Sequence, residues 1–295
     1  MSVFVNKQSR VIFQGFTGEH ATFHAQDAIQ IGTQVVGGVT PGKGGTLHMG
    51  LPVFDTVSEA VRETGADVSA VFVPPAFSAD AIMEAIDAGV KVIVTIADGI
   101  PVQDMIRVQR YRQGRDCILI GPNTPGIITP EACKVGIMPS HIYRKGNVGI
   151  VSRSGTLNYE ATEQMDALGL GITTSVGIGG DPVNGTDFVT VLRAFEEDPE
   201  TEAVVMIGEI GGPQEVAAAR WASENMKKPV IGFVAGISAP AGRRMGHAGA
   251  IISGESDTAN AKMDAMEALG LYVARNPAQI GATVLRALRE NGIQH

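Results

Sequence analysis

Short apolar runs alternate with amphipathic stretches over the first 120 residues, and this alternation limits the possible folds more than any other feature. The apolar runs are Val11–Phe13, Val35–Val36, Val68–Val73, Val92–Ile96 and Ile118–Ile120. Helical patterns lie between them at Ser58–Glu63, Ala79–Ala88 and Asp104–Tyr111. Buried parallel strands are apolar along their whole length, and each needs a crossover, usually a helix, to reach the next. The alternation therefore predicts a parallel sheet covered by helices, a Rossmann-like unit.

The same alternation restarts after a segment rich in proline and glycine, GPNTPGIITPEACKVGIMP. Four further apolar runs predict strands at Val148–Val151, Thr173–Val176, Ala203–Ile207 and Val230–Val234. Helical patterns occur at Leu157–Leu168, Phe188–Glu196, Pro213–Asn225, Thr258–Leu269 and Ile280–Glu290. The repetition predicts two α/β domains, with the first over residues 1–122, a connection over 123–145 and the second over 146–295.

Composition narrows the class of protein. Of the 295 residues, 44% are hydrophobic, which is enough to fill two cores. The net charge of −8 and the lack of a basic cluster disfavour nucleic acid as a partner. No apolar stretch reaches the roughly 18 residues of a membrane span, and the N-terminus has no signal pattern. The two cysteines, Cys117 and Cys133, indicate a reducing compartment, the cytoplasm or a mitochondrial matrix.

Glycine clusters follow the predicted strands in both halves of the chain. QGFTG and GGVTPGKGG follow the first two strands, and SRSGT, GIGGDP and GEIGG each follow a strand in the second half. Ligands of open α/β sheets bind at the carboxyl ends of the strands. The glycines therefore predict a ligand face in each domain.

The first cluster, Gly15 to Gly18, joins a strand to a helical pattern that starts at about Thr22. Backbone N–H groups at such a turn can hold a phosphate, although the full dinucleotide fingerprint is missing. An ordinary strand-to-helix turn is an equally good interpretation of this motif alone.

Lys43 lies where an NAD-binding domain would carry an acidic residue, since no Asp or Glu occurs between Asp27 and Asp55. A cation at this place favours a ligand with extra phosphates, such as CoA, over NAD. Gly44 stands where a P-loop needs Ser or Thr, which excludes that motif. Taken alone, Lys43 could equally be a solvated surface lysine.

Ser154-Gly155-Thr156 opens a helical pattern directly after a strand. A hydroxyl at this position can cap the helix, and the free N–H groups of the first turn attract an anion. Simple capping without a ligand is the structural alternative. Ser152 and Thr156 stand where the glycines of a nucleophile elbow should be, so serine hydrolase chemistry is disfavoured.

His247 lies in RRMGHAGA, between small neighbours that leave its imidazole accessible. Histidine can act as a covalent nucleophile because part of it is unprotonated at neutral pH. Glu209, in GEIGG, follows a strand of the same domain and could orient the ring by accepting a hydrogen bond. The alternatives are a surface-loop histidine and a solvated turn residue. No set of metal ligands is present, because the His20 and His24 pair lacks a third member.

The motifs together resemble the α subunits of succinyl-CoA synthetase over nearly the whole chain. QGFTG, GGVTPGKGG, PVFDTV, GPN, GIVSRSGTL, VGIGGDP, MIGEIGG and MGHAGAI occur in the order and spacing of that family. The resemblance implies a Rossmann-like CoA-binding domain followed by a flavodoxin-like ligase domain. It also implies a β-subunit partner with an ATP-grasp domain, which holds ATP or GTP with Mg²⁺.

The resemblance assigns roles to individual residues. It implies that His247 is phosphorylated and that Glu209 orients it, that Ser154, Gly155 and Thr156 hold the phosphoryl group, and that the acyl phosphate formed next is captured by CoA. CoA-binding residues would be Thr17, Gly18, Glu19, His20, Lys43, Ile96, Ala97 and Asp98. Tyr159, Asn123 and Thr124 would lie near the dicarboxylate substrate.

Several positions depart from the family pattern. His20 replaces Gln, Ala97-Asp98 replaces Thr-Glu, and Thr124 replaces Cys. The segments ATFHA, DGIPVQDMIRV, GPNT, HIY and GEIGGPQE are closer to malate–CoA ligase, a sister enzyme. Succinate is the first expectation for the acid and malate the alternative, with Thr124 as a hydrogen-bond partner for the extra hydroxyl. The competing classes are an NAD-dependent oxidoreductase and a CoA-binding sensor without catalysis.

Overall fold

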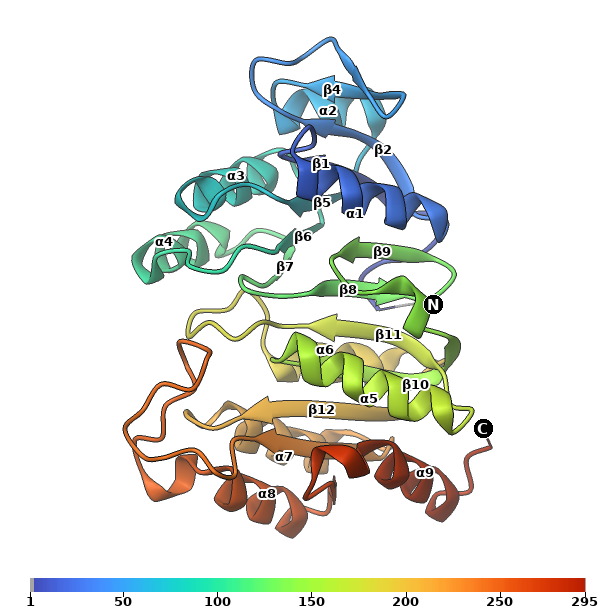
Figure 1. Ribbon diagram of the computed structural model, residues 1–295, viewed down its shortest axis with the longest axis vertical. Coiled ribbons are helices and arrows are strands. Elements are labelled where there is room, and N and C mark those ends of the chain that lie inside the picture. Colours follow the sequence, from blue (N-terminus) through green and yellow to red (C-terminus); the bar gives the residue numbers. More distant parts are fainter. Residues whose placement is uncertain (1–2, 295) are drawn as a thin grey trace. The chain divides into compact units, whose positions relative to one another are not determined.

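The computed structural model describes residues 3–294, which cluster into two compact units (Figure 1). The N-terminal unit comprises residues 4–140 with a short return at 183–185. The C-terminal unit comprises Val3, residues 141–182 and residues 186–294. Residues 1–2 and 295, which the predicted domain ranges include, lie outside the described part of the chain.

A mostly parallel sheet forms the centre of the N-terminal unit. Its strands are β1 (Arg10–Gln14), β2 (Gln34–Val39), β3 (Leu47–His48), β4 (Leu51–Phe54), β5 (Val68–Val71), β6 (Val92–Thr95) and β7 (Ile118–Ile120). The order across the sheet is β3-β4-β2-β1-β5-β6-β7, with only the edge strand β3 antiparallel. The six parallel strands, numbered along the chain, follow the order 3-2-1-4-5-6 of a Rossmann fold.

Helices cover both faces of this sheet. They are α1 (Glu19–Gln30), α2 (Val57–Thr64), α3 (Pro75–Asp87) and α4 (Val102–Arg112). The helices α2, α3 and α4 pack side by side, whereas α1 packs on β1 and β2. Right-handed crossovers that run in opposite directions from β1 place these two groups on opposite faces. Strands β5 and β6 are buried at every position, as their apolar sequence predicts.

A hairpin completes the N-terminal unit. Strands β8 (Gly126–Thr129) and β9 (Cys133–Gly136) pair antiparallel and are fully buried. Lys134 on β9 is 1% exposed, and its ammonium group pairs with Asp27 of α1, which also accepts a hydrogen bond from Ser140. The segment predicted to be a connection thus contains ordered, buried structure.

The C-terminal unit is built around a second parallel sheet. Its strands are β10 (Lys145–Ser152), β11 (Ile172–Gly177), β12 (Ala203–Glu209), β13 (Val230–Ala235) and β14 (Tyr272–Val273). They lie in the order β14-β13-β12-β10-β11. Numbered along the chain this is 5-4-3-1-2, the flavodoxin-like order, in which β10 and β12 flank the point where the chain reverses direction across the sheet.

Five helices cover the second sheet. They are α5 (Gly155–Ala167), α6 (Phe188–Glu197), α7 (Gln214–Asn225), α8 (Ala259–Ala268) and α9 (Ile280–Glu290). The helices α6, α7 and α8 pack in a row, and α5 packs against α9. Side-chain caps from Ser154, Asp187 and Thr258 begin α5, α6 and α8, since each accepts a hydrogen bond from a free first-turn N–H group.

The observed architecture confirms the predicted fold class. Both predicted sheets are present, with the Rossmann-like and flavodoxin-like orders. The strands that sequence analysis missed are β3, β4, β14 and the hairpin, which are all at most four residues long. Within residues 3–294, no helix combines the length and apolar character that a membrane crossing needs.

Candidate functional site

His247 lies in the long segment between β13 and α8. An antiparallel bridge between Arg244 and Ile251 closes a short loop around it. Inside the loop, Met245 N–H donates to the carbonyl of Ala250, and Ala250 N–H in turn lies 3.2 Å from the carbonyl of His247. The small residues of MGHAG thus form a tight turn that presents one imidazole side chain, 27% exposed.

Glu209 orients this imidazole. The Nδ1 atom of His247 lies 2.5 Å from Oε2 of Glu209, which is the last residue of β12. The hydrogen bond with Glu209 raises the pKa of His247 above its ordinary value of 6.5, against the opposing effect of burial. In the neutral ring a proton on Nδ1 directed at the carboxylate leaves the lone pair on Nε2. The pair therefore has the geometry of an activated nucleophile.

The backbone after β11 packs against the imidazole ring of His247. A Cβ atom on Gly180 would lie 2.2 Å from the His247 ring, so only glycine allows the imidazole to pack here. Asp181 and Arg153 are the other charged groups that act on His247, and their effects on its pKa oppose each other. The GIGGDP and GEIGG clusters thus supply the contact surface and the carboxylate for one histidine.

The SRSGT segment joins β10 to α5 beside Glu209. Ser154 caps the helix by accepting a hydrogen bond from Leu157 N–H at 3.3 Å. The N–H groups of Gly155 and Thr156 occupy the first helical positions, where no acceptor exists inside the helix. Arg153 reaches Glu209 at 3.5 Å, which connects this segment to the histidine pair. A helix terminus with free N–H groups and an oriented histidine thus occur at the same sheet edge.

Tyr159 follows one turn later on α5 and is half-buried. Burial raises the pKa of its hydroxyl. No contact between Tyr159 and His247 is seen, so its predicted place near the substrate remains a prediction.

The structure brings Lys43 and Thr17 together in the N-terminal unit. The Lys43 ammonium group donates to Oγ1 of Thr17 at 3.0 Å, although the two residues lie on different loops. Asp55 holds the loop of Lys43 in place by accepting hydrogen bonds from the N–H groups of Gly42 and Gly44 at 2.7 and 2.9 Å. The exposed cation therefore has a fixed anchor point beside the turn that begins α1.

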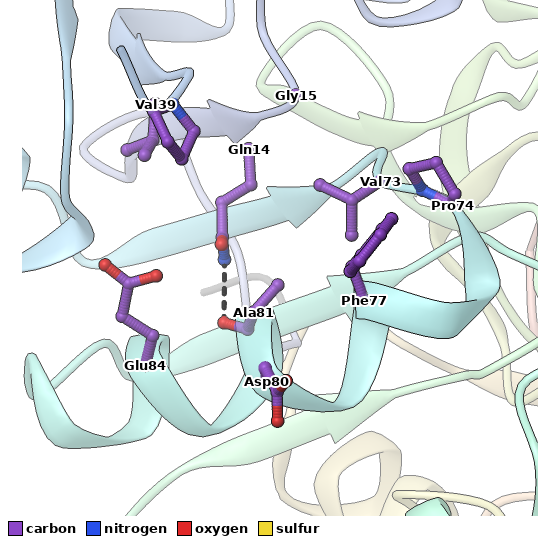
Figure 2. A pocket seen from close by; sticks show the side chains of 10 residues that line it. Gln14, Gly15, Val39, Val73, Pro74, Phe77, Asp80, Ala81 and Glu84 are labelled. Carbon is purple, nitrogen blue, oxygen red and sulfur yellow. Dashed lines mark hydrogen bonds between the residues drawn. The ribbon is translucent and has the colours of Figure 1, made fainter. Parts of the chain in front are cut away.

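A cavity of about 530 Å³ opens at the carboxyl ends of β1, β2 and β5 (Figure 2). Its walls are mostly apolar, and Gln14, Asp80 and Glu84 add polar groups. The Gln14 amide donates to the carbonyl of Ala81, as Figure 2 shows, and to the hydroxyl of Ser69, and these contacts fix its orientation. This is where the strand order reverses between β1 and β5, the usual ligand position in a Rossmann fold.

A second cavity of about 440 Å³ lies between α1 and the ends of β5 and β6. His20, Ile96 and Ala97, three of the predicted CoA-binding residues, line it together with His24. Burial, with a further contribution from the Lys134 ammonium group, lowers the pKa of His24 to about 4, so this imidazole is neutral at physiological pH. Gly18 and Glu19 lie at the start of α1, and Asp98 is exposed after β6.

Asn123 and Thr124 follow β7. Asn123 N–H donates to the carbonyl of Ala97 at 3.0 Å, which ties this loop to the second cavity. Thr124 is 4% exposed, and its Oγ1 accepts a hydrogen bond from Gly126 N–H at 3.0 Å. This contact gives Thr124 a structural role, independent of its predicted place near the substrate.

Sequence analysis missed several residues that shape these sites. Arg153, Glu215 and Lys262 form buried ion pairs behind Glu209, and Gln14, Val39, Pro41, Phe77 and Glu84 line the first cavity. Arg153 could have been found, because it lies inside the SRSGT motif. Among residues 3–294, no group of three or more His, Cys, Asp or Glu could hold a metal ion.

Comparisons with known proteins match both units. A family model of the CoA binding domain matches residues 6–99, and one of the CoA-ligase family matches residues 151–272. The α subunits of ADP-forming succinate–CoA ligase from Staphylococcus epidermidis ATCC 12228 and Staphylococcus aureus Mu50 are each 56% identical over 293 residues. Those matches cover 99% of this chain and 97% of each relative.

Solved structures show the same fold. ATP citrate lyase from Methanothrix soehngenii, in complex with citrate and coenzyme A, superposes with a TM-score of 0.90 at 27% identity over 99% of this chain. This chain spans 52% of that protein's length. The dinucleotide-forming acetyl-coenzyme A synthetase of Ca. Korarchaeum cryptofilum, with a TM-score of 0.71 and 22% identity, shares the fold. With the full-length identity to both staphylococcal subunits, these matches establish that the chain belongs to the family of succinate–CoA ligase α subunits, which are acid–CoA ligases.

Proposed function

We propose that this chain is the catalytic α subunit of an ADP- or GDP-forming succinate–CoA ligase and that His247 carries the phosphoryl group. The 2.5 Å contact between His247 Nδ1 and Glu209 Oε2 is the observation that carries the proposal. The contact leaves Nε2 as the reacting atom and supplies a carboxylate for the charge that develops on the ring. Neither a CoA-binding sensor nor an NAD-dependent oxidoreductase requires such a pair.

In the first step, Nε2 of neutral His247 attacks the γ-phosphorus of a nucleoside triphosphate. The bond from that phosphorus to the bridging oxygen breaks, and the nucleoside diphosphate leaves. The ring gains positive charge, which the carboxylate of Glu209 stabilises through the Nδ1 proton. The phosphoryl group would then be held by Ser154, Gly155 and Thr156 at the positive end of α5.

In the second step, a carboxylate oxygen of succinate attacks the phosphorus and frees the imidazole, which gives succinyl phosphate. The thiolate of CoA then attacks the acyl carbon, forms the thioester and releases inorganic phosphate. Tyr159, Asn123 and Thr124 are the chain's candidates for contact with the acid. The named staphylococcal relatives act on succinate, which favours succinate over malate as the acid.

CoA fits the N-terminal unit. The exposed Lys43 ammonium group, anchored at Thr17, suits the phosphates of CoA, and the N–H groups of Gly18, Glu19 and His20 open α1 toward an anion. The second cavity, lined by His20, Ile96 and Ala97 and followed by Asp98, has the apolar character that a pantetheine arm needs. The first cavity has room for a purine.

The nucleotide and its Mg²⁺ would be bound by a β subunit with an ATP-grasp domain, because this chain has no P-loop and no described metal cluster. We assign CoA binding to residues 1–122, the connection to 123–145 and the ligase chemistry to 146–295. The cytoplasm is the proposed location, or the mitochondrial matrix if the source is eukaryotic.

The test is to incubate the reconstituted complex of α and β subunits with ATP labelled at the γ-phosphate. We expect an acid-labile label on the α chain that succinate and CoA discharge together, with stoichiometric succinyl-CoA. A matched control is His141→Asn, which removes a histidine of the same unit that lies outside the proposed site. A label that is absent, or that persists in His247→Asn, would reject the proposal.

A further inference from the structure

Glu209 belongs to a row of buried charges whose other members, Arg153, Glu215 and Lys262, are given no role by the motifs or the family. Glu215 and Lys262 are 0% exposed, and Arg153 and Glu209 are 6% exposed. Glu215 comes from the first turn of α7 and Lys262 from α8. Charged side chains are almost never fully buried unless they are paired, so the presence of four together demands an explanation.

The four groups form an alternating series of charges. The Lys262 ammonium group lies 2.6 Å from Oε2 of Glu215, and Oε1 of Glu215 lies 3.0 Å from Nε of Arg153. Arg153 Nη1 in turn lies 3.5 Å from Oε1 of Glu209. The series ends at His247, because the other oxygen of Glu209 faces Nδ1 of the ring. Two cations and two anions balance, which lets the series stay buried.

Every polar atom of Glu209 is engaged by this series or by the histidine. Lys262 donates to the carbonyl oxygens of Glu209 and Gly211 at 2.8 and 2.7 Å, which holds the turn after β12. Glu209 N–H lies 3.4 Å from Oε1 of Glu215. The main chain of Glu209 is therefore held at both its N–H and its C=O, and its carboxylate at both oxygens.

The neighbouring backbone leaves space for these side chains. A Cβ atom on Gly208 would lie 2.2 Å from Cγ of Glu215, so glycine is required where β12 passes over that carboxylate. Gly208, the first glycine of the GEIGG motif, thus leaves room for the side chain of Glu215. Helices α7 and α8, which contribute no atom to the histidine contact, act on it through Glu215 and Lys262.

We propose that Glu215 and Lys262 are positioning residues that fix the carboxylate of Glu209 against His247. This inference rests on the proposed function, because it assigns the phosphoryl-transfer chemistry to that histidine. A purely structural ion pair would stabilise the unit without setting the protonation of the ring. The positioning role requires both the rate of phosphorylation and its pH dependence to change when the pair is removed.

Two variants test the proposal in the complex with the β subunit. Lys262→Met removes the ammonium group and leaves the buried Glu215 with Arg153 as its remaining charged partner, which itself weakens the fold. The double variant Glu215→Gln/Lys262→Met removes both charges, so that no unpaired charge stays behind. Lys228→Met is the matched control, because Lys228 also donates to two carbonyls, of Phe195 and Asp198, away from the histidine.

The readout is single-turnover phosphorylation with labelled ATP, measured across pH. For the folded double variant we expect a rate lower by on the order of tenfold to a hundredfold, the usual cost of a misplaced supporting group. Its pH inflection should move to lower pH, because a Glu209 carboxylate that is held less firmly stabilises the protonated ring of His247 less. Arg153 and Asp181 also face the ring and are unchanged in both variants. Lys228→Met should keep the wild-type rate and inflection.

The outcomes distinguish a failure of the proposed function from a failure of the positioning role. A wild-type complex that forms no phosphohistidine would reject the proposed function, and the positioning role with it. A wild-type complex that is phosphorylated, with a folded double variant of unchanged rate and inflection, would reject the positioning role alone. A lower rate without a shift of the inflection would also reject it and leave a structural pair.

Discussion

The two units carry ligand sites at equivalent edges of related sheets, but they use charge in different ways. In the N-terminal unit the predicted cation, Lys43, is exposed and anchored by a single hydroxyl, beside cavities with largely apolar walls. In the C-terminal unit His247 is backed by ion pairs among groups that are at most 6% exposed. The N-terminal unit also contains a buried lysine, Lys134, which pairs with Asp27. Asp27 lies more than two turns along α1, away from the proposed CoA-binding residues at the start of the helix.

The difference follows from what each site must do. A cofactor-sized ligand is recognised by many weak contacts, and an exposed lysine can adjust to a phosphate when it arrives. Phosphoryl transfer needs an atom held in one place with a defined proton, and a water-exposed carboxylate would not ensure that. The buried charges are thus found where chemistry, not recognition, is proposed.

Replacement of His247 should have the largest effect of the predicted changes. A small effect would contradict the assignment of the chemistry to the C-terminal unit. We expect His247→Asn to lower ligase turnover by at least about a thousandfold, because no neighbouring group can accept the phosphoryl group. The Kd for CoA should stay within about twofold of wild type, since the proposed CoA-binding residues all belong to the other unit. Turnover and CoA binding by calorimetry check both parts. Loss of CoA binding would show that the two sites are not separate.

The next effect concerns pH. The hydrogen bond that Nδ1–H of His247 donates to Glu209 raises the pKa of the ring above 6.5, and the attacking ring must be neutral. Phosphorylation should therefore rise with pH and level off above the raised pKa. Glu209→Gln removes the charge, so the inflection should move to lower pH while the plateau falls on the order of a hundredfold. Rapid-quench phosphorylation between pH 5 and 9 would measure both, and an inflection shifted upward would contradict the assigned role.

Much of the fold was predictable from the sequence because buried parallel strands leave a strong signal. The mostly apolar runs Val68–Val73 and Val92–Ile96, predicted to be strands, contain β5 (Val68–Val71) and β6 (Val92–Thr95). The hairpin of β8 and β9 was not predicted, since its glycines and prolines indicate turns and its pairing depends on contacts within the folded unit. The two-residue strands β3 and β14 are too short for any periodic pattern.

The candidate site was only partly predictable. The family motifs identified His247 and Glu209, and their contact in the structure agrees with the orienting role. Glu215 ends the quoted segment GEIGGPQE, but sequence analysis assigned no role to it or to Lys262, because a charged residue in a helix is usually solvated. Their burial arises where α7 and α8 pack on β12 and β13, so it depends on tertiary structure and not on local sequence.

Replacement of Lys43 should have a smaller effect, on the recognition of CoA. Lys43→Ala should raise the KM for CoA on the order of tenfold, since a charge-assisted contact to phosphate is lost. Phosphorylation of His247 by ATP should stay at the wild-type rate. Lys91→Ala is the matched control, because Lys91 is an exposed lysine of the same unit whose ammonium group lies 3.1 Å from Asp116. An unchanged KM for CoA would return Lys43 to an ordinary surface lysine.

Thr124 should give the smallest effect, and it separates a structural role from one in acid specificity. Its buried hydroxyl accepts the N–H of Gly126, and its methyl group packs against Gly121. A thiol is a weaker acceptor, so Thr124→Cys should lower the free energy of unfolding by about 1 kcal/mol. If the hydroxyl serves only the loop, kcat/KM should fall by the same factor, about threefold or less, with succinate and with malate, because a loosened loop affects both acids alike.

Competition between the two acids in one reaction measures that ratio directly, without errors from enzyme concentration. A ratio that moves toward succinate in Thr124→Cys would mean that the threonine hydroxyl reaches the substrate, because only malate carries a hydroxyl group that can lose this contact. Thr129→Cys is a suitable control, since Thr129 is a buried threonine of the adjacent hairpin whose hydroxyl donates to the carbonyl of Val5. A ratio that stays constant in both variants would mean that Thr124 shapes its loop and does not determine which acid is used.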